Sequence, residues 1–174
     1  MITLYWCPQT RASRTLWLLG ELGVDFEIKT IDLKDPESRS DPGFRAASPM
    51  SKVPAIQDGE VRLAESAAIA LYLADRYPDS GLAPGTDHPD RGRYLYWTLY
   101  TPAVIEPAMM ERFNGWEVNP GSSGWGNFDR MISTFERELA DRPCILGDTL
   151  SAADTLLCSS AYFMQAFGIL PDAP

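Results

Sequence analysis

Residues 52–66 have the sequence Lys-Val-Pro-Ala-Ile-Gln-Asp-Gly-Glu-Val-Arg-Leu-Ala-Glu-Ser, which predicts two short strands joined by a tight turn and followed by a helix. The pair Asp58-Gly59 is a favoured two-residue turn of a β-hairpin, and short apolar runs lie on both sides of it. Residues 66–77 are rich in Ala and Leu, which favour a helix, and Pro78 ends it. The predicted unit is a hairpin followed by a helix.

Upstream of this unit, the sequence predicts a strand, a helix and a second strand. Residues 2–5 favour a strand, and residues 14–22 carry leucines at helical spacing until Gly23 ends the helix. Residues 26–31 mix apolar and charged side chains as a strand does, whereas residues 36–47 contain too much Ser, Asp, Pro and Gly for a structure to be assigned. This order of elements predicts an α/β domain.

Downstream, a segment dense in Pro and Gly separates this domain from a second one, and we place the linker at residues 78–89. The sequence then predicts helices at residues 91–113, with kinks at two prolines, and at residues 128–139. A Ser-x-x-Asp capping box begins a third helix near residue 152. Residues 90–174 are therefore expected to form an all-helical domain.

The composition argues against several classes of protein. The 174 residues carry a net charge of −9, which repels nucleic acids and anionic membranes. The three cysteines lack Cys-x-x-Cys spacing and the chain has one histidine, so neither a disulfide framework nor a metal site is indicated. No segment has the pattern of a signal peptide or the length of a membrane span, and we expect a cytoplasmic protein.

Two parts of the hairpin unit have the chemistry of a peptide-binding site. A cis peptide bond before Pro54 can present the backbone groups of Val53 to a peptide ligand. The helix that begins near Ser66 has unpaired N–H groups that suit a carboxylate, the Ser66 hydroxyl is a further donor, and Glu65 can bind an ammonium group. One small zwitterionic peptide would satisfy both parts, although an ordinary helix start would give the same Glu-Ser pair.

Four segments of the sequence resemble the cytosolic glutathione S-transferase superfamily, in its bacterial type. They are residues 5–14, 52–55, 65–73 and 147–154, so the resemblance extends over nearly the whole chain. It implies a thioredoxin-like domain at residues 1–77 and a helical domain at residues 90–174 that supplies an electrophile pocket and dimer contacts. Members usually continue beyond the stretch similar to residues 169–171 with another pair of helices, so the last helices are expected to be missing here.

The resemblance also implies an activity. Members bind glutathione as a co-substrate, stabilise its thiolate for attack on a small hydrophobic electrophile, form homodimers and act in detoxification. By their match to the family motifs, the glutathione-binding residues are expected to be Lys52, Val53, Pro54, Glu65 and Ser66. For Lys52 the alternative is a solvated side chain, because lysines are mostly exposed.

The group that stabilises the thiolate is expected in the turn between the first strand and the first helix, because backbone N–H groups and the helix dipole there favour negative charge. Thr10 stands where several hydroxyl-using classes of the superfamily have a serine, Ser13 lies one turn further, and Cys7 resembles the cysteine of the omega-like classes. Alternatively, Thr10 is only a helix N-cap, Ser13 a capping or packing residue, and Cys7 a small buried residue. Tyr5 is expected in the core.

Two further functions are compatible with the sequence. Cys7 could form a mixed disulfide with glutathione in a thiol oxidoreductase or dehydroascorbate reductase. The fold could also serve as a non-catalytic interaction module. We favour the transferase with Thr10 as the donor, because Thr10 occupies the position where a Cys-x-x-Cys motif beginning at Cys7 would have its second cysteine.

Overall fold

The computed structural model describes residues 1–170, and residues 171–174 of the predicted helical domain lie outside the described part. The chain divides into two compact units, Met1–Ala83 and Pro84–Pro174. None of the helices within residues 1–170 combines the length and the apolar character that a membrane span requires.

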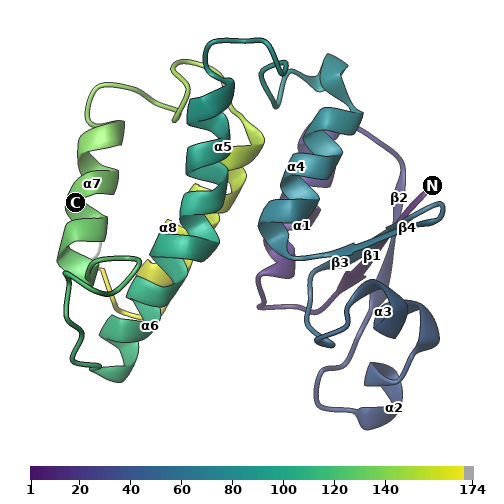
Figure 1. Ribbon diagram of the computed structural model, residues 1–174. Coiled ribbons are helices and arrows are strands. Elements are labelled where there is room, and N and C mark those ends of the chain that lie inside the picture. The colour runs from purple at the N-terminus through teal and green to yellow at the C-terminus, as the bar shows by residue number, and fades with distance from the viewer. Residues whose placement is uncertain (171–174) are drawn as a thin grey trace. The chain divides into compact units, whose positions relative to one another are not determined.

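The first unit is built on a four-stranded sheet with the strand order β2-β1-β3-β4 (Figure 1). β1 runs parallel to β2 and antiparallel to β3, and β3 pairs antiparallel with β4. The strands are β1 (Ile2–Trp6), β2 (Phe26–Thr30), β3 (Ala55–Asp58) and β4 (Val61–Ala64). The predicted α/β class of this unit is confirmed.

Helices cover both faces of this sheet. α1 and α4 pack side by side on one face, and α3 packs against β3 and β4 on the other. Because successive strand residues point to opposite faces, Leu4 and Ile56 face α1 and α4, whereas Tyr5 and Ala55 pack in a cluster with Phe44 of α3. The helices are α1 (Ala12–Leu22), α2 (Pro36–Arg39), α3 (Pro42–Ala47), α4 (Ser66–Arg76) and the short 3-10 helix η1 (Pro78–Ser80).

The hairpin turn lies one residue later than predicted. Asp58 pairs with Val61, so the two loop residues are Gly59 and Glu60, and Asp58 is the last residue of β3. Tertiary contacts explain this register: the Asp58 carboxylate is buried, pairs with Arg76 Nε at 2.7 Å and accepts from the Tyr72 hydroxyl at 3.0 Å. Gly59 then takes the position with a φ of 61°, which favours glycine.

The sequence assigned no structure to residues 36–47, but the structure forms two short helices there. Each begins with an aspartate followed by a proline, the arrangement of an N-cap and a first helical residue that needs no N–H. Asp35 accepts from the backbone N–H groups of Glu37 at 3.0 Å and Ser38 at 3.2 Å. Asp41 accepts from the N–H of Phe44 at 2.9 Å. The Asp-Pro pair, present twice in this segment, is the sequence signal that could have predicted both helix starts.

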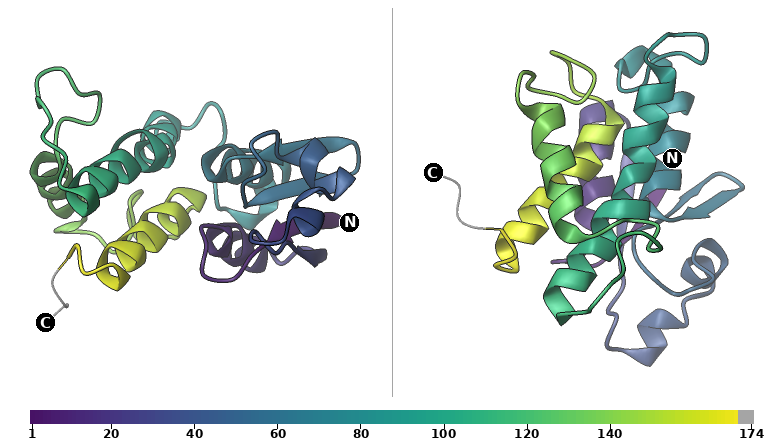
Figure 2. Two further views of the ribbon diagram at one scale, coloured as in Figure 1. Left: turned by 90° about the horizontal axis from the view of Figure 1, so that it is seen from below. Right: turned by 60° about the vertical axis from the view of Figure 1, so that its left-hand side comes forward.

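The second unit is helical, as predicted. Figure 2 shows α8 running alongside α5 within this unit, and these two helices pack against each other. The helix predicted over residues 91–113 contains one π-helical segment, and Pro102, the first of its two prolines, lies in that segment. The elements are α5 (Arg91–Tyr100), the π-helix η2 (Thr101–Ile105), α6 (Glu106–Asn114), α7 (Phe128–Leu139) and α8 (Ala152–Ala166). Pro107 lies in the first turn of α6, directly after the π-helical segment.

The predicted capping box at the start of α8 is confirmed. Asp154 is buried and accepts from the Ser151 backbone N–H at 2.8 Å and the Ser151 hydroxyl at 2.6 Å. Its other oxygen accepts from the Ile145 N–H at 2.7 Å. Asp154 therefore joins the preceding loop to α8, which is a structural role.

Candidate functional site

The three segments that carry the predicted site residues leave the sheet at one end. Tyr5 of β1 pairs with Ala55 of β3, and Ala55 pairs with Ala64 of β4, so these three residues form one row across the sheet. Adjacent strands lie about 4.8 Å apart, which spaces the row over roughly 10 Å. The turn after β1, the segment before β3 and the segment after β4 therefore begin close together.

The segment before β3 contains the predicted cis peptide bond, between Val53 and Pro54. The side chain of the buried Ser48 fixes the start of this segment by two hydrogen bonds. The Ser48 hydroxyl donates to the Lys52 carbonyl oxygen at 2.7 Å and accepts from the Lys52 N–H at 2.9 Å. The Lys52 side chain itself is exposed. Both backbone groups of Lys52 are thus fixed, and its side chain is left to the solvent.

An unusual backbone conformation marks each of the three segments. Three non-glycine residues among those described have a positive φ: Gln9 with 57°, Ser51 with 51° and Glu65 with 71°. Each directly precedes a predicted site residue, namely Thr10, Lys52 or Ser66. Such conformations cost about 1–3 kcal/mol each and concentrate at functional sites. Their coincidence at one end of the sheet makes this end the candidate site.

The turn after β1 is organised by Thr10. Its hydroxyl donates to the Cys7 carbonyl oxygen at 2.7 Å, and the same oxygen accepts from the Ala12 N–H at 3.2 Å. Thr10 therefore caps the first residue of α1. The Ser13 hydroxyl donates to the Thr10 carbonyl oxygen at 3.0 Å, and Ser13 lies inside the first turn of the helix. Cys7 is partly buried and its thiol is free.

The start of α4 offers the donors that an anionic group needs. The first N–H groups of any helix lack intrahelical partners, and here the Glu65 side chain does not cap them. Ser66, the first residue of α4, is partly buried, while Glu65 is exposed. These N–H groups and the helix dipole favour a carboxylate at this end.

Tyr5 has the core position predicted for it. It is 3% exposed and contacts the Phe44 ring, with 5.7 Å between the ring centroids. Burial raises the pKa of its phenol, so Tyr5 stays neutral near pH 7. Within residues 1–170, no group of three His, Cys, Asp or Glu side chains is arranged to hold a metal ion.

Sequence reasoning missed Ser48 as a support of the site and gave Arg14 no role. Arg14 is 2% exposed in α1, one turn after Thr10. Nothing in the local sequence distinguishes Ser48 from the other serines near it. For Arg14, the signal available was a charged residue on the apolar face of the predicted helix.

Comparison with known proteins identifies the family of the first domain. Residues 1–75 match the model of the glutathione S-transferase N-terminal domain. Glutathione S-transferase 3 of Schizosaccharomyces pombe is 34% identical over 107 residues, covering 62% of this chain and 43% of the relative. Residues 1–75 therefore form a glutathione S-transferase N-terminal domain. The whole chain spans less than half of the length of this curated relative.

Solved structures of the superfamily share the fold. A glutathione S-transferase of Actinobacillus pleuropneumoniae aligns with a TM-score of 0.77 and 27% identity, covering 96% of this chain and 79% of the other. A sphingomonad glutathione S-transferase, complexed with glutathione, aligns with a TM-score of 0.76 and 28% identity, covering 95% and 84%. The predicted combination of a thioredoxin-like domain and a helical domain is therefore confirmed.

Proposed function

We propose that this protein is a glutathione transferase that binds glutathione where the three segments leave the sheet. The backbone of Val53, presented by the cis bond to Pro54, pairs with the cysteinyl residue of glutathione. Ser66 and the start of α4 bind the γ-glutamyl carboxylate, and Glu65 binds its ammonium group. Lys52 directly precedes Val53 in the chain, and its ammonium group pairs with the glycine carboxylate of glutathione. The main support is the positive φ immediately before Thr10, Lys52 and Ser66.

In this proposal Thr10 stabilises the glutathione thiolate. A free thiol has a pKa near ~8.5, so most of it is protonated at neutral pH and is a poor nucleophile. The Thr10 hydroxyl lies at the start of α1, where the helix dipole also favours negative charge. The thiolate sulfur then attacks the carbon of a small apolar electrophile and expels its leaving group. Ser13 supports Thr10 by its hydrogen bond to the Thr10 carbonyl.

A second candidate function uses Cys7, whose free thiol lies in the same turn. Its thiolate would attack the glutathionyl sulfur of a mixed disulfide between glutathione and a substrate thiol, form a mixed disulfide of Cys7 with glutathione and release the substrate thiolate. A second glutathione thiolate would then attack the glutathionyl sulfur, release the Cys7 thiolate and leave as oxidised glutathione. These steps describe a glutathione-dependent thiol oxidoreductase; in a dehydroascorbate reductase, dehydroascorbate would be the oxidant that converts Cys7 and one glutathione to the same mixed disulfide and is itself reduced to ascorbate.

Two measurements test the proposed function. Retention on immobilised glutathione tests binding, and conjugation of glutathione to an apolar aryl halide tests turnover. Binding with turnover supports the transferase. Binding without turnover, and without reductase activity, would leave a non-catalytic module of this fold and contradict the proposal.

We also propose that the protein forms a symmetric homodimer. Several large apolar side chains on α5 and α6 are exposed in the single chain, among them Leu99 at 49% and Phe113 at 62%. A second copy would bury such surface through contacts on α4 and on residues 91–113. We expect light scattering at micromolar protein concentration to give twice the monomer mass, and a monomeric mass would refute this.

A further inference from the structure

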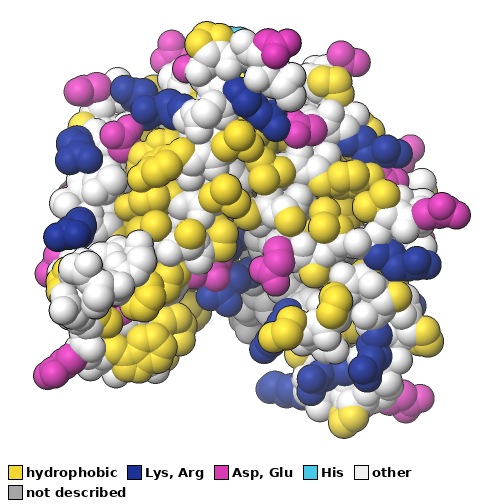
Figure 3. Space-filling view, in the orientation of Figure 1, with side chains coloured by type: hydrophobic (Ala, Val, Ile, Leu, Met, Phe, Trp, Pro, Cys, Tyr) yellow, Lys and Arg dark blue, Asp and Glu magenta, His cyan; other side chains and the backbone are white. Residues whose placement is uncertain are grey.

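Two cysteines of the helical unit take no part in the function or in the dimer contacts proposed above. Cys144 lies in the loop between α7 and α8, and Cys158 lies in α8. Figure 3 shows hydrophobic side chains gathered over α5, where dimer contacts are proposed, whereas α8 and the loop before it contribute none of those contacts. Cys144 is partly buried, Cys158 has exposed surface, and both thiols are free. Both are therefore open to a reagent in solution.

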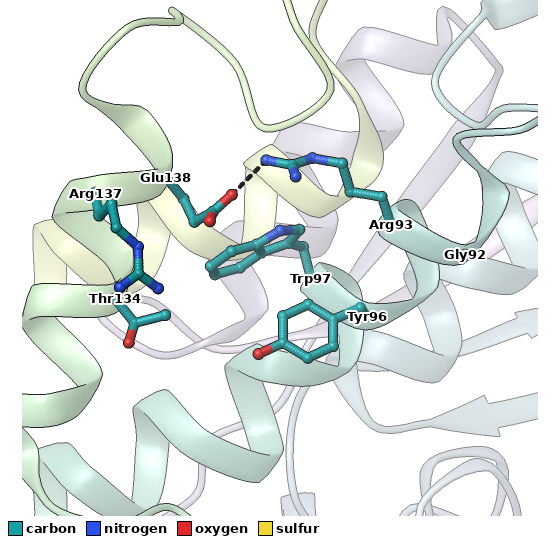
Figure 4. Close-up of a pocket in the computed structure, with 7 residues that line it drawn as sticks. All are labelled: Gly92, Arg93, Tyr96, Trp97, Thr134, Arg137 and Glu138. Carbon is teal, nitrogen blue, oxygen red and sulfur yellow. Dashed lines mark hydrogen bonds and ion pairs between the residues drawn. The ribbon is translucent and has the colours of Figure 1, made fainter.

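The position of Cys144 is set through its neighbour Ile145, which is buried. The Ile145 N–H donates to the Asp154 carboxylate at 2.7 Å, which ties the loop to the first turn of α8. The Ile145 carbonyl oxygen accepts from Arg93 Nε at 2.8 Å. Arg93 is itself held by Glu138 of α7 at 2.6 Å (Figure 4). Cys144 thus directly precedes a residue that is bonded to α5 on one side and to α8 on the other.

Cys144 also begins a tight turn. Its N–H donates to the Gly147 carbonyl oxygen at 3.0 Å, and its own carbonyl oxygen accepts from the Gly147 N–H at 3.0 Å. These bonds keep Cys144 beside the start of α8. Residues 140–143, which come before it, are exposed, so Cys144 can make the small adjustments that the geometry of a disulfide requires.

Cys158 lies one helical turn after Asp154. Residues four apart share a face of a helix, and helical side chains lean toward the N-terminus, so the Cys158 thiol leans toward the carboxylate that holds the loop. The electrostatics agree with this placement. Desolvation by the surrounding protein, followed by the Asp154 charge, raises the pKa of both thiols, and Cys144 raises that of Cys158 further. One carboxylate therefore acts on both thiols.

We propose that Cys144 and Cys158 form a reversible disulfide by exchange with glutathione disulfide. The thiolate of one cysteine attacks a sulfur of glutathione disulfide, forms a mixed disulfide and releases one glutathione thiolate. The thiolate of the other cysteine attacks the protein sulfur of this mixed disulfide and releases the second glutathione thiolate. The two protein thiols are oxidised and lose their protons to the solvent, and one glutathione disulfide is reduced to two glutathiones, which take protons up.

Closure of the disulfide is favoured over a lasting mixed disulfide because both thiols belong to one folded unit. Two groups held near each other on one chain have an effective concentration of about a millimolar or more. The exchange takes place at the thiols themselves, so it does not depend on the glutathione site proposed in the first unit. The bond links the loop to α8 a second time, next to the contact between Ile145 and Asp154.

The test incubates the reduced full chain in glutathione redox buffers at pH 8.5, where a larger share of each thiol is thiolate. The exchange is quenched with acid, the remaining thiols are blocked with N-ethylmaleimide, and the digested peptides are identified by mass spectrometry. We expect a peptide cross-linked between Cys144 and Cys158, half formed when the ratio [GSH]²/[GSSG] is about 1 mM or higher. Dithiothreitol should remove it.

Variants show which thiols take part. Cys158→Ser should abolish the cross-link and leave Cys144 as a mixed disulfide with glutathione. Cys7→Ser removes the thiol of the first unit, is the matched control and should keep the cross-link. Because the cross-link is measured on the unsubstituted chain, the result does not depend on the folding of a variant. The proposal is overturned if only mixed disulfides with glutathione form, if the cross-link joins Cys7 or two separate chains, or if half formation requires a ratio far below the millimolar range.

Discussion

Thr10 donates its hydroxyl proton to the backbone oxygen of Cys7, with 2.7 Å between Thr10 Oγ1 and Cys7 O. A hydroxyl has one proton, so Thr10 can donate to the sulfur of glutathione only by leaving this carbonyl. A hydrogen bond to a charged group contributes ~1.5–3 kcal/mol, against ~1 kcal/mol for a neutral one. The thiolate is therefore the better acceptor. The Ala12 N–H can keep its bond to the same oxygen during the exchange, because it uses a lone pair.

The first prediction concerns Thr10→Ala. Loss of the donor should raise the pKa of bound glutathione by about 1–2 units, since one unit corresponds to about 1.4 kcal/mol. Conjugation at neutral pH should fall by roughly tenfold or more. Thiolate absorbance of the saturated complex, followed against pH, measures the pKa, and Thr10→Ser is the control that keeps a hydroxyl.

Thr10→Ala together with a second variant, Cys7→Ser, separates the transferase from the oxidoreductase. In the transferase, Cys7→Ser should leave conjugation nearly unchanged. In the oxidoreductase, mass spectrometry should find a mixed disulfide of glutathione at Cys7, and Cys7→Ser should abolish reductase activity. Normal thiol pKa and conjugation in Thr10→Ala, together with rapid labelling of Cys7 by oxidised glutathione, would contradict the role given to Thr10.

The second prediction concerns the start of α4. Ser66→Ala removes a hydroxyl donor to the γ-glutamyl carboxylate, and Glu65→Ala removes the partner of its ammonium group. Each should weaken glutathione binding several-fold in calorimetry, because a single polar contact that contributes ~1 kcal/mol changes an equilibrium constant by about fivefold. Ser133→Ala, at an exposed position in α7, is the control. Unchanged affinity in both site variants would exclude this site.

Much of the fold could be predicted because its signals are local. The leucine spacing of α1, the Val53-Pro54 pair and the capping box at Ser151 and Asp154 each depend on residues that are close in sequence. The hairpin was predicted with its turn one residue early. The choice between Asp58 and Gly59 as the first loop residue depends on Arg76 and Tyr72, which contact Asp58 from α4.

The geometry of the candidate site was less accessible from the sequence. Gln9, Ser51 and Glu65 have positive φ, yet none is a glycine or an asparagine, so their residue types give no warning. Ser48 acts on Lys52 through a hydroxyl in a loop that had no predicted structure. Conformations of this kind are imposed by the surrounding fold, and a residue-by-residue pattern does not contain them. The roles of the site residues remain predictions.

The third prediction concerns the dependence of stability on pH. Asp41 caps α3 and pairs with Lys29 Nζ of β2 at 2.6 Å. The hydrogen bond from Lys29, followed by that from the Phe44 N–H, holds the pKa of Asp41 below its ordinary value of 3.8. The folded state thus binds the proton less well than the unfolded state. The stabilisation is complete when the pH is above the pKa of Asp41 in the unfolded state. It is lost as the pH falls through the lower pKa of Asp41 in the folded state.

For this reason Asp41→Asn should lower the free energy of unfolding at pH 7 by about 0.5–1 kcal/mol, since the pair is partly exposed. Below pH 3.8 the difference between the two proteins should shrink. Urea unfolding at pH 7 and near pH 3 measures both values. Asp25→Asn, at an exposed position before β2, serves as the comparison. An equal difference at the two pH values would show that the Asp41 charge does not stabilise the fold.

The last prediction concerns Ser48, which supports the segment that presents Val53. Ser48 is 1% exposed, and its hydroxyl bridges the N–H and C=O groups of Lys52 at 2.9 and 2.7 Å. Ser48→Ala leaves both groups without this partner and should cost ~1–3 kcal/mol in the free energy of unfolding. Because Val53 follows directly, glutathione affinity should also fall several-fold, while the pKa of the bound thiol, set at Thr10, should not change. Ser40→Ala, which removes an exposed hydroxyl from the end of α2, is the matched control. Reduced stability with unchanged affinity would show that Ser48 maintains the fold alone and does not position the site.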